Sequence, residues 1–496
     1  MSAPQPVLRT TPGELAESVA AGIRQGGRLA ALVASGRDNG SHVLRAILAT
    51  AGRLAVIESS LSPGVEVYPA VTALVPGATW YEREIHDLFG LVPRGHGRLD
   101  PLVLPLADGA ARPRPGASGA PGAVDLAVAG LPGHVTGEGV FTIPYGPVRS
   151  GVFESVQYLV ETVGEEIPHL RTRVYHKHRG IERRFQELGM DDAVLLAERV
   201  EGTASVAHAL AFCQALEALA EVTVPRRAAL VRVAHAELER IVTHLDSVIR
   251  HTEGAGQAVA NARLSVHKER LLRLRARLCG HRFGRGVVVI GGVSGPPLIA
   301  PSEAVGVTTT LERALRADLD ALMSTPSFLD RLRGTGVLPA EVAGADGAVG
   351  PVARGSGIDT DVRAERPYAA YQELGFVARI GSSDGDALER QRVRLDEIAT
   401  SFELVRHALG TLDDRDGPWS AEAVLGAGTV VTSVEAPQGE LLYLVESNGT
   451  ALVRVKPRTA SFQNLSLLSE AFRGDIFTDF VFIEASFGVS IAGVSL

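Results

Sequence analysis

A stretch rich in proline, glycine and alanine divides this chain of 496 residues into two unequal parts. It runs from residue 106 to about residue 135 and reads ADGAARPRPGASGAPGAVDLAVAGLPGH over most of its length. Such a composition buries too little apolar surface to offset the entropy lost on ordering, so we expect a linker. The sequence therefore predicts a small domain at residues 1–105 and a large domain at residues 136–496.

The small domain is predicted to be of the α/β type. Between residues 29 and 74, short apolar runs such as RLAALVAS and RLAVIESS indicate strands, with one helix expected at residues 42 to 50. The next segment, TWYEREIHDLFG, predicts a second helix, because apolar residues recur every four positions and Gly90 stands where a helix would stop. Thr79 and Glu82 fit a capping box at its start. Taken alone, this segment is typical of a surface helix whose polar face carries ion pairs.

The large domain is predicted to be mainly helical with peripheral β-structure, which makes the whole chain α+β. Pro225 precedes a long amphipathic helix, and further helices are expected at about residues 261–279, 303–323 and 387–412. Alternating residues on both sides of Asn448-Gly449 predict a β-hairpin. The apolar C-terminal segment FVFIEASFGVSIAGVSL is expected to form a buried strand and tail.

Composition excludes several classes of function. The formal net charge of -8 argues against a nucleic-acid partner, which would require clustered cationic residues. No uncharged apolar run reaches the roughly 18 to 20 residues that span a bilayer, and none follows Met1, so we expect a soluble cytoplasmic chain. Cys213 and Cys279 are the only cysteines and lie far apart, so an iron-sulfur cluster would have to sit in another protein.

The most distinctive chemistry lies between residues 171 and 217, where a basic turn precedes a helix rich in small residues. Most such charge runs are solvated faces, but this one could also face an electron-rich group such as a reduced cluster in a partner. The cationic side chains are Arg171, Arg173, His176, Lys177, His178, Arg179, Arg183 and Arg184.

Glu201 is expected inside that helix, among apolar neighbours, where a carboxyl group must be paired or protonated. A structural ion pair with Arg199 or with the basic turn would satisfy it, and a proton-handling role is the alternative. His235, Glu239 and His244 lack the spacing of a zinc motif, so we favour helix packing over a metal site. No P-loop and no GxGxxG after a strand is present, which argues against nucleotide binding.

Ordered motifs give the chain a family resemblance over nearly its whole length. WYEREIHDLFG and GHGRLDPLVLP resemble the 30 kDa subunit of respiratory complex I. GPVRSG, HRGIERR, RVEGTASVAH, ELERIVTHLD, RPYAAY, GDALER, EAPQGEL and ASFQNL resemble, in order, its 49 kDa subunit. That subunit is homologous to the large subunit of group 4 nickel-iron hydrogenases, and a fusion of the two resembles the large subunit of formate hydrogenlyase. The resemblance implies NAD binding only as a property associated with the family.

The resemblance also implies what this chain lacks. Hydrogenases of this family hold nickel and iron with two CxxC pairs, because soft thiolates suit that metal pair. The first pair would fall at Glu201 and Ala204, and the second at Ser490 and Gly493. All four thiolates are missing, so we expect no metal in this chain. The sequence is thus similar to energy-converting hydrogenase-related complexes that keep the architecture without the nickel-iron site.

The residues that complex I uses for quinone are replaced as well. By the same resemblance, Arg149 stands where a histidine is expected, Gly202 where a tyrosine is expected, and Gly254 near an expected aspartate. Arg179, in HRG, matches the arginine beside the terminal cluster. His178 and Arg179 are therefore expected to face the iron-sulfur cluster of a partner. The candidate catalytic residues that would line the altered cavity are Glu201, Arg149 and His208.

Two functions remain open at this point. The first is a redox subunit that takes electrons from an iron-sulfur small subunit to a quinone or another acceptor, with no cofactor bound by this chain itself. The second is a structural subunit that bridges the iron-sulfur subunit and a membrane arm. Both imply a hetero-oligomer on the inner face of the cell membrane, with complex I-like or antiporter-like membrane subunits. One accessible cavity would favour the first, and a cavity filled by Phe487 and Phe212 the second.

Overall fold

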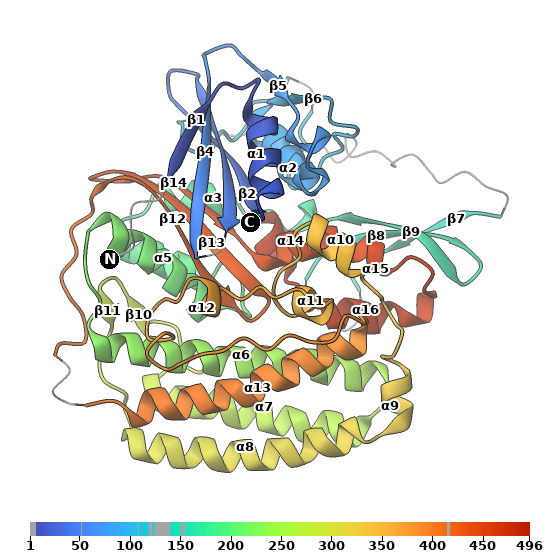
Figure 1. The fold of residues 1–496 in the computed structure, drawn as a ribbon, viewed down its shortest axis with the longest axis vertical. Helices are drawn as coiled ribbons and strands as arrows, with labels where there is room; N and C mark the ends of the chain where they lie inside the picture. Colours follow the sequence, from blue (N-terminus) through green and yellow to red (C-terminus); the bar gives the residue numbers. More distant parts are fainter. Residues whose placement is uncertain are drawn as a thin grey trace.

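The computed structural model describes residues 6–50, 52–107, 109–118, 122, 124, 139–149, 154–413 and 417–496. As expected, the chain is α+β: a small sheet domain sits on a larger, mainly helical domain (Figure 1). Most of the predicted linker, including residues 125–135, lies outside the described residues. The domain boundaries therefore stay a prediction.

A four-stranded sheet with the order β1-β4-β3-β2 forms the core of the small domain. Only the β1–β4 pair is parallel, and the other neighbours are antiparallel. Two helices pack against this sheet. The elements are β1 (Val7–Thr10), α1 (Leu15–Arg24), β2 (Arg28–Gly36), β3 (His42–Thr50), β4 (Arg53–Leu61), β5 (Val67–Pro69), α2 (Thr79–Phe89) and β6 (Val92–Arg94).

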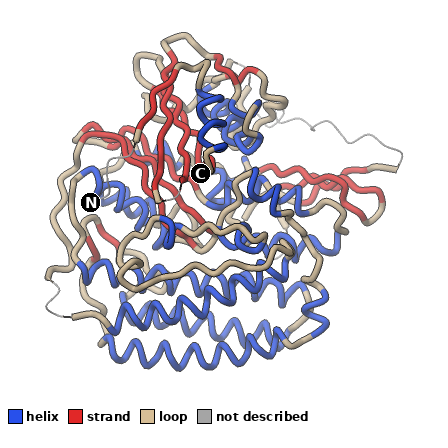
Figure 2. Tube along the Cα trace, viewed as in Figure 1, coloured by secondary structure: helices blue, strands red, loops and turns tan. Residues whose placement is uncertain are grey.

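The helix predicted at residues 42 to 50 is wrong, because this segment is β3, one of the two inner strands of the small domain's sheet. The strands of this sheet are red in the upper part of Figure 2. β3 pairs with β2 on one side and β4 on the other, which satisfies its backbone groups. Its side chains are buried almost without interruption, so the sequence shows no clear period of two. A short apolar run of this kind does not separate strand from helix.

The part of the predicted linker that is described near residue 118 packs on the small domain. The Arg114 N–H donates to the Leu88 carbonyl at 3.0 Å, and the Gly36 N–H donates to the Pro115 carbonyl at 3.0 Å. Ala117 is only 9% exposed. Backbone hydrogen bonds to the sheet domain therefore order a segment whose composition predicts a free chain.

Four long helices form the lower layer of the large domain in Figure 1. They confirm the helices predicted from apolar periodicity, and the stripe of α6 from Leu230 to Val248 is buried. The helices are α6 (Arg226–Gly254), α7 (Ala258–Cys279), α8 (Pro301–Met323) and α13 (Ala387–Gly410). Shorter helices connect them: α9 (Pro326–Asp330), α10 (Ala340–Ala345), α11 (Gly350–Gly355) and α12 (Val362–Glu365), with the two-residue strands β10 (Val288–Val289) and β11 (Gly292–Val293) before α8.

Two three-stranded sheets accompany these helices. One contains the predicted hairpin, in the order β12 (Ala427–Ala436), β13 (Gly439–Asn448) and β14 (Leu452–Arg458), and α5 (Ser205–Leu219) packs on it. The other extends to one side in Figure 1 and consists of β7 (Phe141–Tyr145), β8 (Gln157–Val163) and β9 (Glu166–Arg173). Between β9 and α5 lie α3 (Ile181–Phe185) and α4 (Met190–Ala197).

The C-terminal segment is buried, as predicted, but it is helical rather than a strand. It forms α16 (Phe480–Phe487) and α17 (Ile491–Ser495), which follow α14 (Ala460–Ser466) and α15 (Leu468–Ala471). Gly488 ends α16 in the left-handed conformation, with φ 63°. The two short helices place residues 490–496 in the centre of the molecule.

The predicted surface helix α2 is instead buried between the two domains. Its apolar face is buried as expected, but Glu82 and Asp87 are also only 0% and 2% exposed. The Glu82 carboxylate accepts N–H groups of Val71 and Thr72 at 2.8 and 3.0 Å, so it does not cap its own helix. Asp87 accepts three N–H groups from the segment that follows α2. The capping box and the exposed ion pairs are therefore wrong.

Buried ion pairs join the two domains beside this helix. Glu84 of α2 accepts from Lys456 Nζ at 2.7 Å and from Arg458. Lys456 also pairs with Glu182 of α3, and Glu182 with Arg454. One continuous apolar core runs from the small sheet to α14 and α16. The two domains thus share a core and a charged cluster.

Candidate functional site

Glu201 lies in the turn between α4 and α5, not inside a helix as predicted. Its side chain is 2% exposed and points at Gly493 of α17. A Cβ atom at Gly493 would overlap Glu201 Oε2, so the carboxyl group occupies the space that a side chain at Gly493 would need. Two positions separated by almost 300 residues therefore meet at one point.

Burial raises the pKa of Glu201 to about 8, and the nearby carboxylates of Glu154 and Glu239 act in the same direction, against the opposing charge of Arg179. Within the described residues, Glu201 Oε2 has no hydrogen-bond partner. At neutral pH this carboxyl group holds its proton.

His208 is the one other predicted catalytic residue beside Glu201. Its Nε2 lies 3.9 Å from Glu201 Oε1, which is too far for a direct hydrogen bond. Its Nδ1 shares a 2.7 Å hydrogen bond with the Tyr443 hydroxyl. Burial, assisted by the charge of Arg179, lowers the pKa of His208 to about 3, so the imidazole is neutral.

Arg149 belongs to a separate ion pair. Its guanidinium donates to both oxygens of Glu484, at 3.0 and 2.7 Å, and lies over the rings of Tyr145 and Tyr158. The Tyr158 hydroxyl donates to the same carboxylate at 2.9 Å. Within the described part of the chain, no contact joins Arg149 to Glu201 or His208. The structure brings two of the three predicted catalytic residues together and satisfies the third elsewhere.

The basic turn points partly inward. His178 Nδ1 donates to the Ser495 carbonyl at 2.5 Å, and burial lowers the pKa of its ring. The Arg179 guanidinium donates to the carbonyls of Arg199 at 3.1 Å, Val200 and Ala492 at 2.9 Å. Both predicted cluster-facing residues therefore contact the segments that flank Glu201 and Gly493.

Glu154 is a member of this site that sequence reasoning missed. Its carboxylate accepts from the Ser490 hydroxyl at 3.1 Å and from the N–H groups of Ile491 and Ala492, so it holds the start of α17. It stands five residues after Arg149, but nothing in that local pattern indicates a contact with the C-terminal segment.

Glu239 and His244 make contacts of the kind that the packing interpretation of His235, Glu239 and His244 predicts. Glu239 accepts the N–H groups of Val206 and Ala207 at 2.8 and 3.0 Å, so α6 holds the start of α5. His244 Nε2 lies 2.8 Å from Glu397 Oε2 of α13. Among the residues that the structure describes, no three His, Cys, Asp or Glu side chains are grouped as metal ligands would be.

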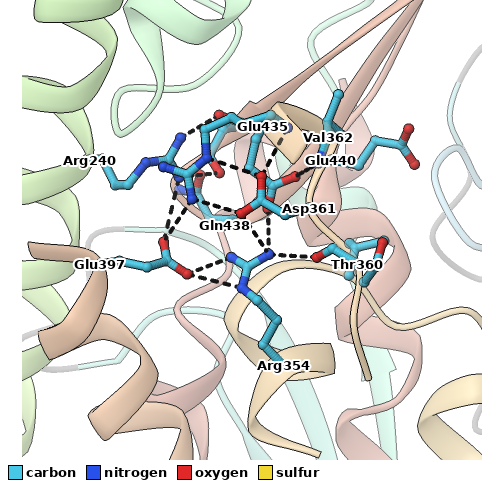
Figure 3. A network of polar contacts seen from close by, with 12 residues as sticks. Arg240, Arg354, Thr360, Asp361, Val362, Glu397, Glu435, Gln438 and Glu440 are labelled. Carbon is cyan, nitrogen blue, oxygen red and sulfur yellow. Dashed lines mark hydrogen bonds and ion pairs between the residues drawn. The ribbon is translucent and has the colours of Figure 1, made fainter. Parts of the chain in front are cut away.

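A buried ion network lies next to this site (Figure 3). Arg354 donates to Glu397 and, at 2.9 Å, to Glu435, and Arg240 reaches Glu397 at 3.7 Å. Gln438 Nε2 donates to Thr203 Oγ1 at 2.8 Å, which ties the hairpin of β12 and β13 to the turn that bears Glu201. The acids and arginines come from α6, α11, α13 and β12. No local pattern indicates this network, because each residue pairs across a long stretch of sequence.

Two surface pockets lie away from Glu201, His208 and Arg149. One, of about 320 Å³, is lined by residues that include Arg363, Tyr371 and Phe376. The other, of about 410 Å³, lies between residues 374–379 and the last turns of α13. The predicted common cavity of Glu201, Arg149 and His208 matches neither pocket.

The side chains at the four positions where the resemblance places the hydrogenase cysteines do not fit a nickel-iron centre. Glu201, Ala204, Ser490 and Gly493 offer one carboxyl group, one methyl group, one hydroxyl group and no side chain. None is a thiolate, and the carboxyl group of Glu201 fills the space beside Gly493. Among the helices in the described part of the chain, none combines the length and the apolar composition that a membrane span requires.

Comparisons with known proteins identify relatives over most of the chain. The family described as "Respiratory-chain NADH dehydrogenase, 30 Kd subunit" matches residues 29–112, and "Respiratory-chain NADH dehydrogenase, 49 Kd subunit" matches residues 256–426 and 419–495. The carbon monoxide-induced hydrogenase of Rhodospirillum rubrum is 34% identical over 68% of this chain and 94% of its own length.

Two further relatives are subunits of other enzyme complexes. An NADH-quinone oxidoreductase subunit of Anaeromyxobacter sp. (strain K) is 32% identical over 70% of this chain and 93% of its own length. Formate hydrogenlyase subunit 5 of Escherichia coli (strain K12) is 27% identical over 83% of this chain and 74% of its own length, which includes part of the small domain here. The chain belongs to the family of large subunits that complex I shares with its hydrogenase relatives, and it joins 30 kDa-type and 49 kDa-type domains in one polypeptide.

Proposed function

We propose that this chain is the large subunit of a membrane-associated oxidoreductase complex that takes electrons from an iron-sulfur partner to a quinone-like or other acceptor, without a nickel-iron site. Its relatives include subunits of NADH-quinone oxidoreductase and formate hydrogenlyase, which supports an assembly of several different subunits. The proposed partners are an iron-sulfur small subunit and complex I-like or antiporter-like membrane subunits. We propose that the complex lies on the inner face of the cell membrane.

The observation that carries this proposal is Glu201, a buried carboxyl group at the position of the first missing thiolate. Its pKa of about 8 lets it take up or release a proton near neutral pH. A proton-exchanging group at this place suits electron transfer to an acceptor that is protonated when reduced. His208 is neutral, and its Nε2 lies 3.9 Å from Glu201 Oε1, so it is a residue that could exchange a proton with Glu201.

The partner's iron-sulfur cluster is proposed to lie against the basic turn. Arg184 and Arg179 are both exposed residues, although the Arg179 guanidinium bonds backbone carbonyls. Positive charge at this surface would raise the reduction potential of a nearby cluster. We propose no metal or other cofactor bound by this chain, with quinone as the acceptor class nearest to the complex I relatives.

A structural subunit without chemistry of its own is the second candidate, because the interior at this site is filled. Phe212 and Phe487 are both fully buried. Glu201 Oε2 occupies the space that a side chain at Gly493 would need, and Arg149 forms an ion pair with Glu484. Close packing of this kind is what an interior without a binding role would have.

Turnover of the purified complex with Glu201→Gln distinguishes the two. The amide keeps the size and hydrogen-bonding capacity of the protonated acid but does not exchange a proton. We expect it to lower turnover at least tenfold, since a positioned acid or base contributes about 10²–10⁴-fold. Glu187→Gln, which changes an exposed acid of the same region, is the control. Full activity of Glu201→Gln would favour the structural subunit.

A further inference from the structure

Two distant segments are joined by one arginine side chain. Arg179 Nη1 donates to the Arg199 carbonyl at 3.1 Å, and Nη2 donates to the carbonyls of both Val200 and Ala492. Val200 and Ala492 directly precede Glu201 and Gly493. The guanidinium therefore connects the two backbones at the point where Glu201 meets α17.

The rest of the basic turn holds the same helix. The N–H groups of Arg179 and Gly180 donate to the Leu496 carbonyl at 3.0 Å each, and His178 donates to the Ser495 carbonyl. α17 has only five residues, and the last four carbonyl groups of a helix lack partners within it. Donors from the basic turn bond two of these carbonyls, those of Ala492 and Ser495, which helps to hold such a short helix in the core.

Glu154 and Thr459 complete this arrangement. Glu154 accepts N–H groups at the start of α17, and the Thr459 hydroxyl donates to the Gly493 carbonyl at 2.8 Å. The guanidinium of Arg179 also lies close enough to Glu154, and to Glu201 when that group is ionised, for their negative charges to favour its charged form. It thus forms the cationic centre between two acids and two chain segments.

We infer that Arg179 is a cross-link that holds the Glu201 turn against α17. A guanidinium suits the task because its planar fork offers five donors and stays charged. Arg179 is accordingly a positioning residue for Glu201, and this role does not depend on the proposed electron path.

Hydrogen exchange on the full chain in its purified complex tests this inference. The variants are Arg179→Ala and Arg179→Lys, with Arg184→Ala as a control that removes an exposed charge from the same cluster. Lysine keeps the charge but cannot reproduce the fork across two backbones. We expect both Arg179 variants to speed amide exchange in residues 198–204 and 489–496 about tenfold or more, as the loss of charged hydrogen bonds implies. The control should match the wild type in both segments.

A second readout follows the carboxyl band of Glu201 in infrared titrations. Arg179 opposes the rise in the pKa of Glu201, so Arg179→Ala should move the midpoint of that band to higher pH, while Arg179→Lys should move it less. Wild-type exchange rates in Arg179→Lys would overturn the cross-link, even if Arg179→Ala does not fold. An unchanged Glu201 midpoint in Arg179→Ala would overturn its role in positioning Glu201.

Discussion

Replacing Glu201 with glutamine should remove a specific pH dependence from the stability of this protein. In the folded chain the pKa of Glu201 is about 8, against an ordinary value of 4.5. Between these two values the folded state binds a proton that the unfolded state has released. The contribution of Glu201 to the free energy of unfolding is therefore fully present below about pH 4.5, and it is lost as the pH rises through about 8.

The size of the effect follows from the same two values. The difference between 4.5 and about 8 corresponds to about 5 kcal/mol as an upper value, since each pKa unit is about 1.4 kcal/mol. Glutamine is neutral at every pH and close in shape to the protonated acid. We expect equal stabilities of the two proteins near pH 4, and a variant that is more stable by several kcal/mol above about pH 8.5.

Denaturant unfolding of wild type, Glu201→Gln and Glu187→Gln at several pH values measures this difference. Comparison with the wild type at each pH cancels the contributions of the other titrating groups. Infrared difference spectra provide a direct check, because the carboxyl band that disappears near pH 8 in the wild type should be missing in Glu201→Gln. Parallel stability curves for wild type and Glu201→Gln would refute a buried, protonated Glu201. So would a carboxyl band with a midpoint near pH 4.5.

Two other predictions concern the missing metal and the joint between the domains. Elemental analysis of the purified complex should find no stoichiometric nickel in this subunit, since all four thiolate positions lack cysteine, and bound nickel would contradict the assignment of those positions. Lys456→Met should destabilise the chain by about 3–5 kcal/mol, because it leaves Glu84 and Glu182 buried with one partner fewer each. The thermal midpoint measures this loss, Lys177→Met is the surface control, and equal midpoints for the two variants would show that the buried cluster adds nothing.

The long helices could be predicted because their apolar residues repeat at helical spacing over many turns. The stripe of α6 is such a case, and its residues are buried as expected. β3 and the C-terminal helices could not be predicted, because their runs are short and mostly apolar, without a clear period. Whether such a run becomes a strand or a helix depends on neighbours that are distant in sequence.

The candidate site was predictable in its composition but only partly in its geometry. The resemblance placed Glu201 and Gly493 at related positions, and the structure brings them into contact. It gave no reason for Glu154 to hold α17 or for Arg149 to pair with Glu484, because these contacts cross more than 300 residues. Which polar groups pair in a core depends on the tertiary fold, and the local sequence does not predict it.

The buried cluster around Lys456 also bears on why the two domains occur in one polypeptide. Glu84 comes from the small domain, whereas Lys456 and Glu182 come from the large one, so either half alone would expose unmatched charge and part of the shared core. Separate genes would have to supply both halves in equal amounts and at the same time. A single gene fixes their stoichiometry at one to one and makes their encounter intramolecular. In the fusion, neither domain is made without the other, and an unpaired domain would be prone to aggregation or degradation.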